Sequence, residues 1–422
     1  MTDDVALLLR RATFGPTAAE LGRARATGYS AALTTLLAPS GTDRGAARAP
    51  IPDLGLDPYA GKSSVTLEQS RVFDGVRERQ TAVIHRWILD RMTVADHQAA
   101  EKLVFFWHGH WATSVKKVRS PQLMLAQQRT LRGARDYADL TRKMVVDAAL
   151  IAYLDGHQNT RAAPNENLAR ELFELFTLGV GQYNEKDLKE AGRALTGWRF
   201  SLTEERAVFE PAKHDTGVKT VLGSTANHDA ASVVELLLRQ PVCAEHIASR
   251  LWLRYASSGT PMPAATRDAM TAVFPDTRAM LRALFQSDAF QATAGTLVKQ
   301  PMEWLVGAMR QLGIRPASLP EKTFNDILDD LTSLGQRPFT PPNVGGWPSG
   351  AAWLSSAAAQ VRLRLAGRLA KMLVADRLTP EGMAYVLGLD GWTNRTYAVL
   401  RESGDPHRLL TLGLVSPEYL VT

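Results

Sequence analysis

Cysteine is almost absent from this chain of 422 residues, because Cys243 is the only one present. A single thiol cannot form a disulfide within the chain. It also cannot supply the several thiolates of a cysteine-based zinc site or an iron–sulfur cluster. Any bound metal ion would therefore have to be held by histidine and carboxylate side chains.

Long apolar runs are missing as well. No segment approaches the roughly 18 consecutive apolar residues that a transmembrane helix needs. The first residues do not have the pattern of a signal peptide, because Asp3 and Asp4 stand where positive charge is expected. Arg10 and Arg11 then cut the apolar stretch short. These absences predict a protein without a membrane span that resides in the cytoplasm.

Positive and negative charges are nearly balanced in this chain. Lys and Arg outnumber Asp and Glu by 49 to 43, and this difference is spread over the whole chain. The densest basic cluster, Lys116, Lys117 and Arg119, has no nucleic-acid-binding motif beside it. We interpret it as a solvated face, and we predict no nucleic-acid partner.

The chain is otherwise typical of a globular protein, with 45% hydrophobic and 22% charged residues. Apolar residues at three- and four-residue spacing predict helices over residues 67–92, 95–107, 120–133, 137–153, 165–178 and 185–195. Residues 198–222 alternate like a short hairpin. The sequence therefore predicts a mainly α, multi-helix globular bundle with a small β-hairpin near residues 198–222. We expect one domain over residues 1–422, with 198–228 as a joining segment between helical halves 1–197 and 229–422.

Two histidines within an aromatic segment are the strongest local signal. His108 and His110 lie in Phe-Trp-His-Gly-His-Trp at residues 106–111. Residues two apart on a helix point about 200° away from each other, so both could bind one ion only if Gly109 lets the helix unwind. The alternative is that both are core residues, each hydrogen-bonded to a backbone carbonyl. Both interpretations stay open, because histidine is a common metal ligand and acid–base group.

Charged residues recur along the predicted helix 165–178. Arg170 lies four residues after Glu166 and four before Glu174, which is the spacing of ion pairs on a solvated helix face. Glu171 and Glu174 also belong to a polar stripe beside leucines, and a buried carboxylate stripe could hold a metal ion or act on protons. The ion-pair interpretation is favoured because buried carboxylates are rare.

A third polar segment follows the predicted hairpin. His214, Asp215 and Lys219 lie close together in the sequence and form a compact acid–base set on a loop. A tight turn that needs only Asp and Gly would give the same residues.

A loop rich in proline and glycine spans residues 336–350. It presents Asn343 and Trp347, and Trp353 follows it. Such a rigid loop could cover a pocket or bind a partner protein, but packing of its tryptophans against the helices is the favoured interpretation.

Several of these segments match one known family in order along the chain. The matching stretches are Arg-Arg-Ala-Thr-Phe-Gly-Pro at 10–16, Phe-Trp-His-Gly-His-Trp at 106–111, Asn-Glu-Asn-Leu-Ala-Arg-Glu at 165–171, Ala-Leu-Thr-Gly-Trp at 194–198, His-Asp at 214–215, and Pro-Asn-Val-Gly-Gly-Trp-Pro at 342–348. In these stretches the chain resembles the bacterial family called domain of unknown function 1800, DUF1800. One departure is Phe176, which stands where many relatives have a histidine and weakens any metal site that needs this position.

The resemblance implies a single helical domain and no established activity. Relatives are often encoded beside a sulfatase-like family that carries a twin-arginine export signal. This implies a sulfatase-like partner, and export in complex with it is the alternative to the cytoplasm.

Our leading functional hypothesis is an enzyme with a pocket between helices that is lined by His108, His110, Glu171 and His214, around an iron- or zinc-type ion. It would carry out Lewis-acid or redox chemistry.

In that hypothesis, Asp215 or Glu174 orients a ligand, and Lys219 or Arg170 holds an anionic substrate. One alternative is a metal-free acid–base enzyme that uses His214 and Asp215. The other is a non-catalytic binding or assembly protein whose Trp347 and Trp353 dock a partner.

Overall fold

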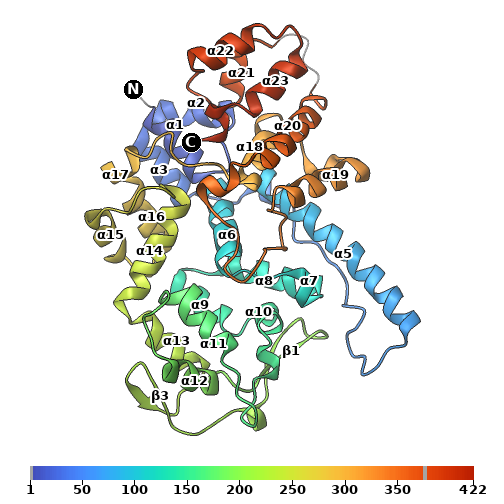
Figure 1. Cartoon of the computed structure of the whole chain (residues 1–422), viewed down its shortest axis with the longest axis vertical. Helices are drawn as coiled ribbons and strands as arrows, with labels where there is room; N and C mark the ends of the chain where they lie inside the picture. Colours follow the sequence, from blue (N-terminus) through green and yellow to red (C-terminus); the bar gives the residue numbers. More distant parts are fainter. Residues whose placement is uncertain (1–2, 374–377) are drawn as a thin grey trace.

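The computed structural model describes residues 3–373 and 378–422. About 60% of the chain is helical, and the described residues contain two small two-stranded antiparallel sheets. The prediction of a mainly α fold with a small hairpin is therefore confirmed. No helix in the described residues is long and apolar enough to cross a membrane. In Figure 1, the earliest and the latest helices lie together at one end, and both sheets lie at the other.

The first part of the chain is entirely helical. Its helices are α1 (Asp4–Ala12), α2 (Ala18–Thr27), α3 (Tyr29–Leu37), α4 (Arg44–Ala47), α5 (Leu67–Val94), α6 (Gln98–His110), α7 (Val115–Val118), α8 (Pro121–Gly133), α9 (Tyr137–Met144) and α10 (Ala148–Tyr153). Local signals fix several of these ends. The Thr66 hydroxyl accepts a hydrogen bond from Gln69 N–H and the Gln69 side chain accepts one from Thr66 N–H, which is a capping box at the start of α5.

The middle of the chain is less regular. It contains the 3₁₀ turn η1 (Gly156–Gln158), α11 (Asn167–Glu171), the π-helical turn η2 (Leu172–Thr177), α12 (Glu185–Ala194), β1 (Trp198–Ser201), β2 (Arg206–Phe209), η3 (Pro211–Lys213), β3 (Lys219–Val221) and β4 (Ser224–Ala226). In the first sheet Trp198 lies opposite Phe209, and in the second Lys219 lies opposite Ala226. β1 also packs against α10.

Helices resume after the sheets. They are α13 (Ala230–Leu238), α14 (Pro241–Tyr255), α15 (Ala264–Thr271), α16 (Thr277–Phe285), α17 (Asp288–Gln291), α18 (Pro301–Gln311), α19 (Glu321–Ser333), α20 (Ser356–Ala370), α21 (Pro380–Val386), α22 (Asn394–Arg401), α23 (Pro406–Leu414) and α24 (Pro417–Leu420), with short 3₁₀ turns η4 (Pro316–Ser318) and η5 (Gly350–Trp353). Several begin with proline at their first position, where the missing N–H costs no helical hydrogen bond.

Two predicted helices differ from the structure. Residues 137–153 form α9 and α10 rather than one helix, because the Asp147 side chain accepts a hydrogen bond from Leu150 N–H and starts a new helix. Residues 165–178 begin as α11 but widen into the π-turn η2. The Thr177 hydroxyl donates to the carbonyl of Leu172, five residues earlier.

The buried apolar residues form two hydrophobic clusters. One gathers side chains from α1, α3, η2, α13, α14 and α16, and the other from α5, α8, α10, α18, α19, α20 and α23. Each cluster therefore combines residues from before and after the segment 198–228. Helix α6 contributes to both, since Phe106 belongs to the first cluster and Phe105 to the second. The end of α6 thus lies where the two clusters meet.

Candidate functional site

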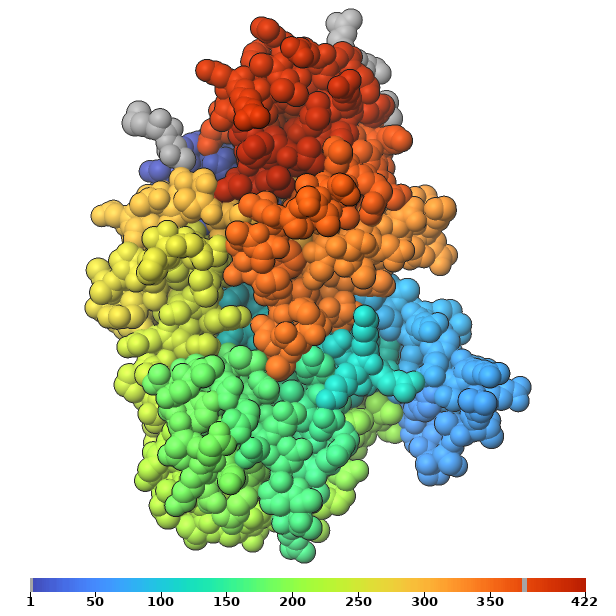
Figure 2. Space-filling model, viewed as in Figure 1, coloured from blue at the N-terminus to red at the C-terminus, as the bar shows by residue number. Residues whose placement is uncertain are grey.

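A small pocket opens at the C-terminal end of α6. Its volume is about 70 Å³. In Figure 2 atoms of α6 are visible in the hollow between the yellow segment of α14 and the orange loop before η5. The lining residues come from α6, α14 and two loops: Phe105, Phe106, Gly109, His110, Arg250, Leu253, Arg254, Gln300, Trp347 and Ser349.

One wall of the pocket is a loop that lies unusually close to α6. Gly346 has a φ of +82°, and a Cβ atom at this position would stand 2.1 Å from the carbonyl oxygen of Gly109. Only glycine fits such an approach. It allows Trp347 to pack on α6, where its ring lies 6.1 Å from that of Phe105 at an angle of 28°. Gly109 therefore serves packing, and α6 remains helical through His110.

Two buried histidines hold the base of this loop. Nε2 of His108 accepts the backbone N–H of Phe339 at 3.2 Å, and the side-chain amide of Gln128 lies 3.2 Å from Nδ1. Nε2 of His85 donates to the carbonyl of Pro338 at 3.0 Å. Burial lowers the pKa of each histidine to about 3, so both rings are neutral. His108 thus positions the loop through the hydrogen bond that its Nε2 accepts.

His110 is the histidine that lines the pocket. Its Nε2 donates to the carbonyl of Phe176 at 3.0 Å, a carbonyl at the end of η2 that also accepts the hydroxyl of Tyr137. A neutral imidazole carries one N–H, so Nδ1 has a free lone pair. Nδ1 is buried without a hydrogen-bond partner. Burial, together with the charge of Arg250 and the neighbouring His246, places the pKa of His110 well below 6.5.

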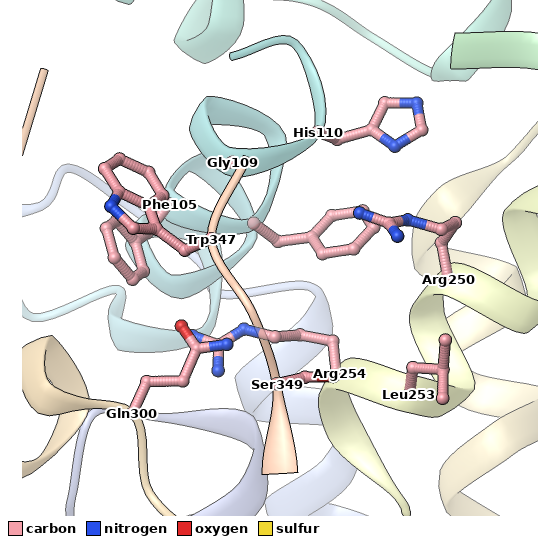
Figure 3. A pocket seen from close by; sticks show the side chains of 10 residues that line it. Phe105, Gly109, His110, Arg250, Leu253, Arg254, Gln300, Trp347 and Ser349 are labelled. Atoms are coloured by element: carbon pink, nitrogen blue, oxygen red, sulfur yellow. The ribbon is translucent and has the colours of Figure 1, made fainter. Parts of the chain in front are cut away.

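Two arginines of α14 line the pocket. Arg250 and Arg254 are four residues apart, so they project from the same side of the helix. Figure 3 shows their guanidinium groups entering from different directions, with Arg250 on the side of His110. The Arg250 Nε and the Arg254 Nη2 are both buried without a hydrogen-bond partner. Burial alone lowers the pKa of Arg250, and no carboxylate opposes this effect.

A buried carboxylate supports the second arginine. Glu303 of α18 accepts from Arg254 Nη1 at 2.8 Å and from Lys102 Nζ at 2.6 Å. Burial opposes ionisation of Glu303, but Arg254 and Lys102 outweigh it and lower its pKa to about 2. Burial in turn lowers the pKa of Lys102 to about 8. Arg254 is therefore fixed by an ion pair and still presents an unpaired nitrogen.

Comparison with known families gives one result. The sequence matches the family described as "Protein of unknown function (DUF1800)" over residues 7–421. The chain belongs to the DUF1800 family. A search of curated proteins and a search of solved structures found no match. The two motifs at residues 106–111 and 342–348, which carry the family resemblance, meet at the pocket through Gly109, His110 and Trp347.

The structure does not assemble the metal ligands that the sequence suggested. Among the described residues, no three His, Cys, Asp or Glu side chains form a group that could hold a metal ion. His108 lies against Phe339, and His110 lines the pocket. Glu171 lies at the end of α11, where burial and the nearby Glu174 raise its pKa. The three residues thus have separate surroundings in this DUF1800 chain.

The charged residues of α11 and η2 form an ion-pair network. Arg170 pairs with Glu166 at 2.9 Å, Glu174 at 3.4 Å and Glu185 at 2.9 Å, and its side chain is about one third exposed. Glu174 also accepts a hydrogen bond from the hydroxyl of Tyr183. The favoured sequence interpretation, an ion-pair ladder on a helix face, describes these contacts.

The third predicted cluster forms a turn whose polar side chains already have hydrogen-bond partners. The Lys219 ammonium donates to the carbonyl oxygens of Asp215 at 2.6 Å and Gly217 at 2.9 Å. The Asp215 carboxylate accepts from Arg193 at 2.8 and 3.2 Å. His214 Nδ1 donates to the carbonyl of Thr196 at 2.9 Å. Lys219 and Asp215 are therefore in contact within this turn, whereas the His214 side chain bonds to Thr196.

The tryptophans of the loop contact the protein itself. Trp353, in η5, is 4% exposed, and Trp347 packs on α6. Asn343 is exposed and accepts the N–H of Gly345 at 2.9 Å, which shapes the turn before Trp347.

Sequence reasoning missed Arg250 and Arg254. Their i, i+4 spacing on α14 resembles an ordinary solvated face. The available signal was the absence of acidic residues at the positions that would pair with them: Arg250 has Ile247 and His246 before it and Leu253 and Arg254 after it.

Proposed function

We propose that this DUF1800 protein is an enzyme whose active site is the pocket between α6, α14 and the Trp347 loop. The observation that supports this is the unpaired lone pair of His110 Nδ1, which lies beside the unpaired guanidinium of Arg250. Folded proteins leave few buried polar atoms without partners, because each costs free energy. A pocket that collects several of them is suited to a ligand that completes their hydrogen bonds.

In this proposal His110 is the general base. The carbonyl of Phe176 fixes its Nε2–H, so Nδ1 is the nitrogen that accepts a proton from an O–H or N–H of the substrate or from water. The protonated ring would carry positive charge beside Arg250. A negative charge on the substrate would reduce that repulsion, so the base becomes effective when an anionic substrate is bound.

Arg250 and Arg254 bind the anionic part of the substrate. Both are guanidinium groups with free nitrogens in a partly buried site, where hydrogen bonds between charged groups are strongest. Trp347 and Phe106 form apolar walls that limit the entry of water.

The test is conversion of acidic small molecules, followed by mass spectrometry. We expect the wild type to consume one or more members of the panel. The His110→Asn variant should be slower by at least about 100-fold, because a general base contributes that much or more. His214→Asn is the matched control, since His214 lies outside the pocket, and it should behave as the wild type. A wild type that converts no member of the panel, or equal rates for His110→Asn and the wild type, contradicts the proposal.

A further inference from the structure

We infer that the pocket binds the tetrahedral oxyanion of a phosphate or sulfate ester rather than a carboxylate. This inference rests on the proposed function, because it names the class of substrate for the same pocket. Three features support it: the directions of the donors, the local charge and the size of the pocket.

The donors do not lie in one plane. Figure 3 shows the guanidinium of Arg250 entering beside His110, whereas that of Arg254 enters beside Gln300. A carboxylate offers two oxygens in a single plane and is well served by one guanidinium. A tetrahedral oxyanion offers oxygens in several directions and can accept from two guanidinium groups at once.

The charge around the pocket favours an anionic ligand. Arg250, Arg254 and Lys102 have one carboxylate between them, Glu303, which pairs with Arg254 and Lys102. Burial lowers the pKa of Arg250, and no carboxylate counteracts this effect. Positive charge is therefore in excess beside the pocket, at Arg250. An anionic phosphate or sulfate group reduces that excess.

The size agrees with this assignment. A pocket volume of about 70 Å³ has room for a small polar group. A phosphate or sulfate group has five heavy atoms, and a carboxylate group has three. The bound group would occupy this pocket, which Leu253 and Ser349 also line.

The experiment is calorimetric titration of the full chain with inorganic phosphate, sulfate and acetate at equal ionic strength. We expect phosphate or sulfate to bind at least about tenfold more tightly than acetate. Tighter binding of phosphate assigns phosphate esters as the substrate class, and tighter binding of sulfate assigns sulfate esters. Acetate that binds as tightly as both, or the absence of binding by all three anions, overturns the inference.

Variants locate the bound anion. Arg250→Gln should weaken oxyanion binding at least about tenfold, because a charged hydrogen-bond donor is lost. Arg250→Lys should be intermediate, since it keeps the charge and loses the planar fork. Arg239→Gln, at an exposed arginine that ends α13, is the matched control and should bind like the wild type. Circular dichroism checks that each variant is folded. Binding by folded Arg250→Gln at the wild-type affinity overturns the inference.

The two proposals fail separately. If oxyanions bind through Arg250 but no conversion depends on His110, the enzyme proposal fails and the ligand assignment stands. If conversion depends on His110 but acetate binds as tightly as phosphate and sulfate, the ligand assignment fails and the enzyme proposal stands.

Discussion

Histidine lies beside basic side chains in two regions of this protein, and the regions differ in how their polar atoms are paired. In the turn around His214, Lys219 donates to two carbonyls and to Asn227, and Asp215 is held by Arg193. In the pocket around His110, nitrogens of His110, Arg250 and Arg254 remain unpaired.

Both regions carry functional hypotheses in the sequence, because His110 lies among aromatic residues and His214 lies beside Asp215 and Lys219. The hydrogen bonds separate them. Groups that already satisfy one another stabilise a turn, whereas buried groups without partners lower stability and remain available to a ligand. Under the proposed function, the His214 turn serves the fold and the His110 pocket binds the substrate, and four predictions test this comparison.

The largest expected effect is loss of stability in the paired region. Lys219→Met should lower the free energy of unfolding by about 3 kcal/mol, because two buried carbonyls and Asn227 lose a charged donor. Oxyanion binding should not change. Chemical denaturation measures the first quantity and calorimetry the second. Lys186→Met, at an exposed position of α12, is the control and should leave stability unchanged. If Lys219→Met and Lys186→Met lower the free energy of unfolding by similar amounts, the paired turn is not distinguished from the rest of the protein.

The next effect concerns pH in the unpaired region. The free His110 has a pKa well below 6.5, because of burial and the charges of Arg250 and His246. Bound sulfate would raise this pKa, so the complex takes up a proton, and sulfate affinity should increase as pH falls. Because one proton is taken up, the gain should be at most about tenfold per pH unit. Calorimetry between pH 5 and 8 measures this slope, and His110→Asn should abolish it. A slope that persists in that variant would point to another titrating group.

A smaller effect of opposite sign is expected at Arg250. Replacing an unpaired, partly buried charge with an apolar side chain of similar length should stabilise the protein, so Arg250→Met should gain about 1 kcal/mol. Phosphate should raise the melting temperature of the wild type and not that of the variant. A variant less stable than the wild type would show that Arg250 serves the fold, as Lys219 does.

The smallest expected effect is that of a chelator. The proposed site uses His110 and two arginines, and Nε2 of His108 already accepts the N–H of Phe339. Treatment with a strong chelator should therefore leave oxyanion binding and conversion unchanged within error. Elemental analysis of the same samples is the control, and loss of conversion together with loss of a metal ion would restore the metal-dependent hypothesis.

Most helices could be predicted from the sequence because their signals, apolar spacing and capping residues, lie within or next to each helix. The apolar spacing and the capping box identify α5 without reference to the rest of the molecule. The break between α9 and α10 and the widening at η2 were missed, because an apolar repeat continues through both. At these places, side-chain hydrogen bonds to the backbone override the apolar pattern.

The candidate site was predicted only in part. His110 and Trp347 lie in unusual aromatic and glycine-rich motifs that the sequence makes visible. The unpaired state of His110 Nδ1 depends on the carbonyl of Phe176, which no residue pattern encodes. Arg250 comes from a distant helix, and its lack of a partner is a property of the packed molecule.

The contact between Gly109 and Gly346 also suggests how the pocket could be altered. Because backbone meets backbone there, the distance between α6 and the loop depends on the absence of a side chain at Gly346. In Gly346→Ala, the added methyl group would push the loop away from α6 and move Trp347 with it. Position 346 is therefore the point at which a single added methyl group should widen the site for bulkier ligands while leaving the residues that bind the anion in place.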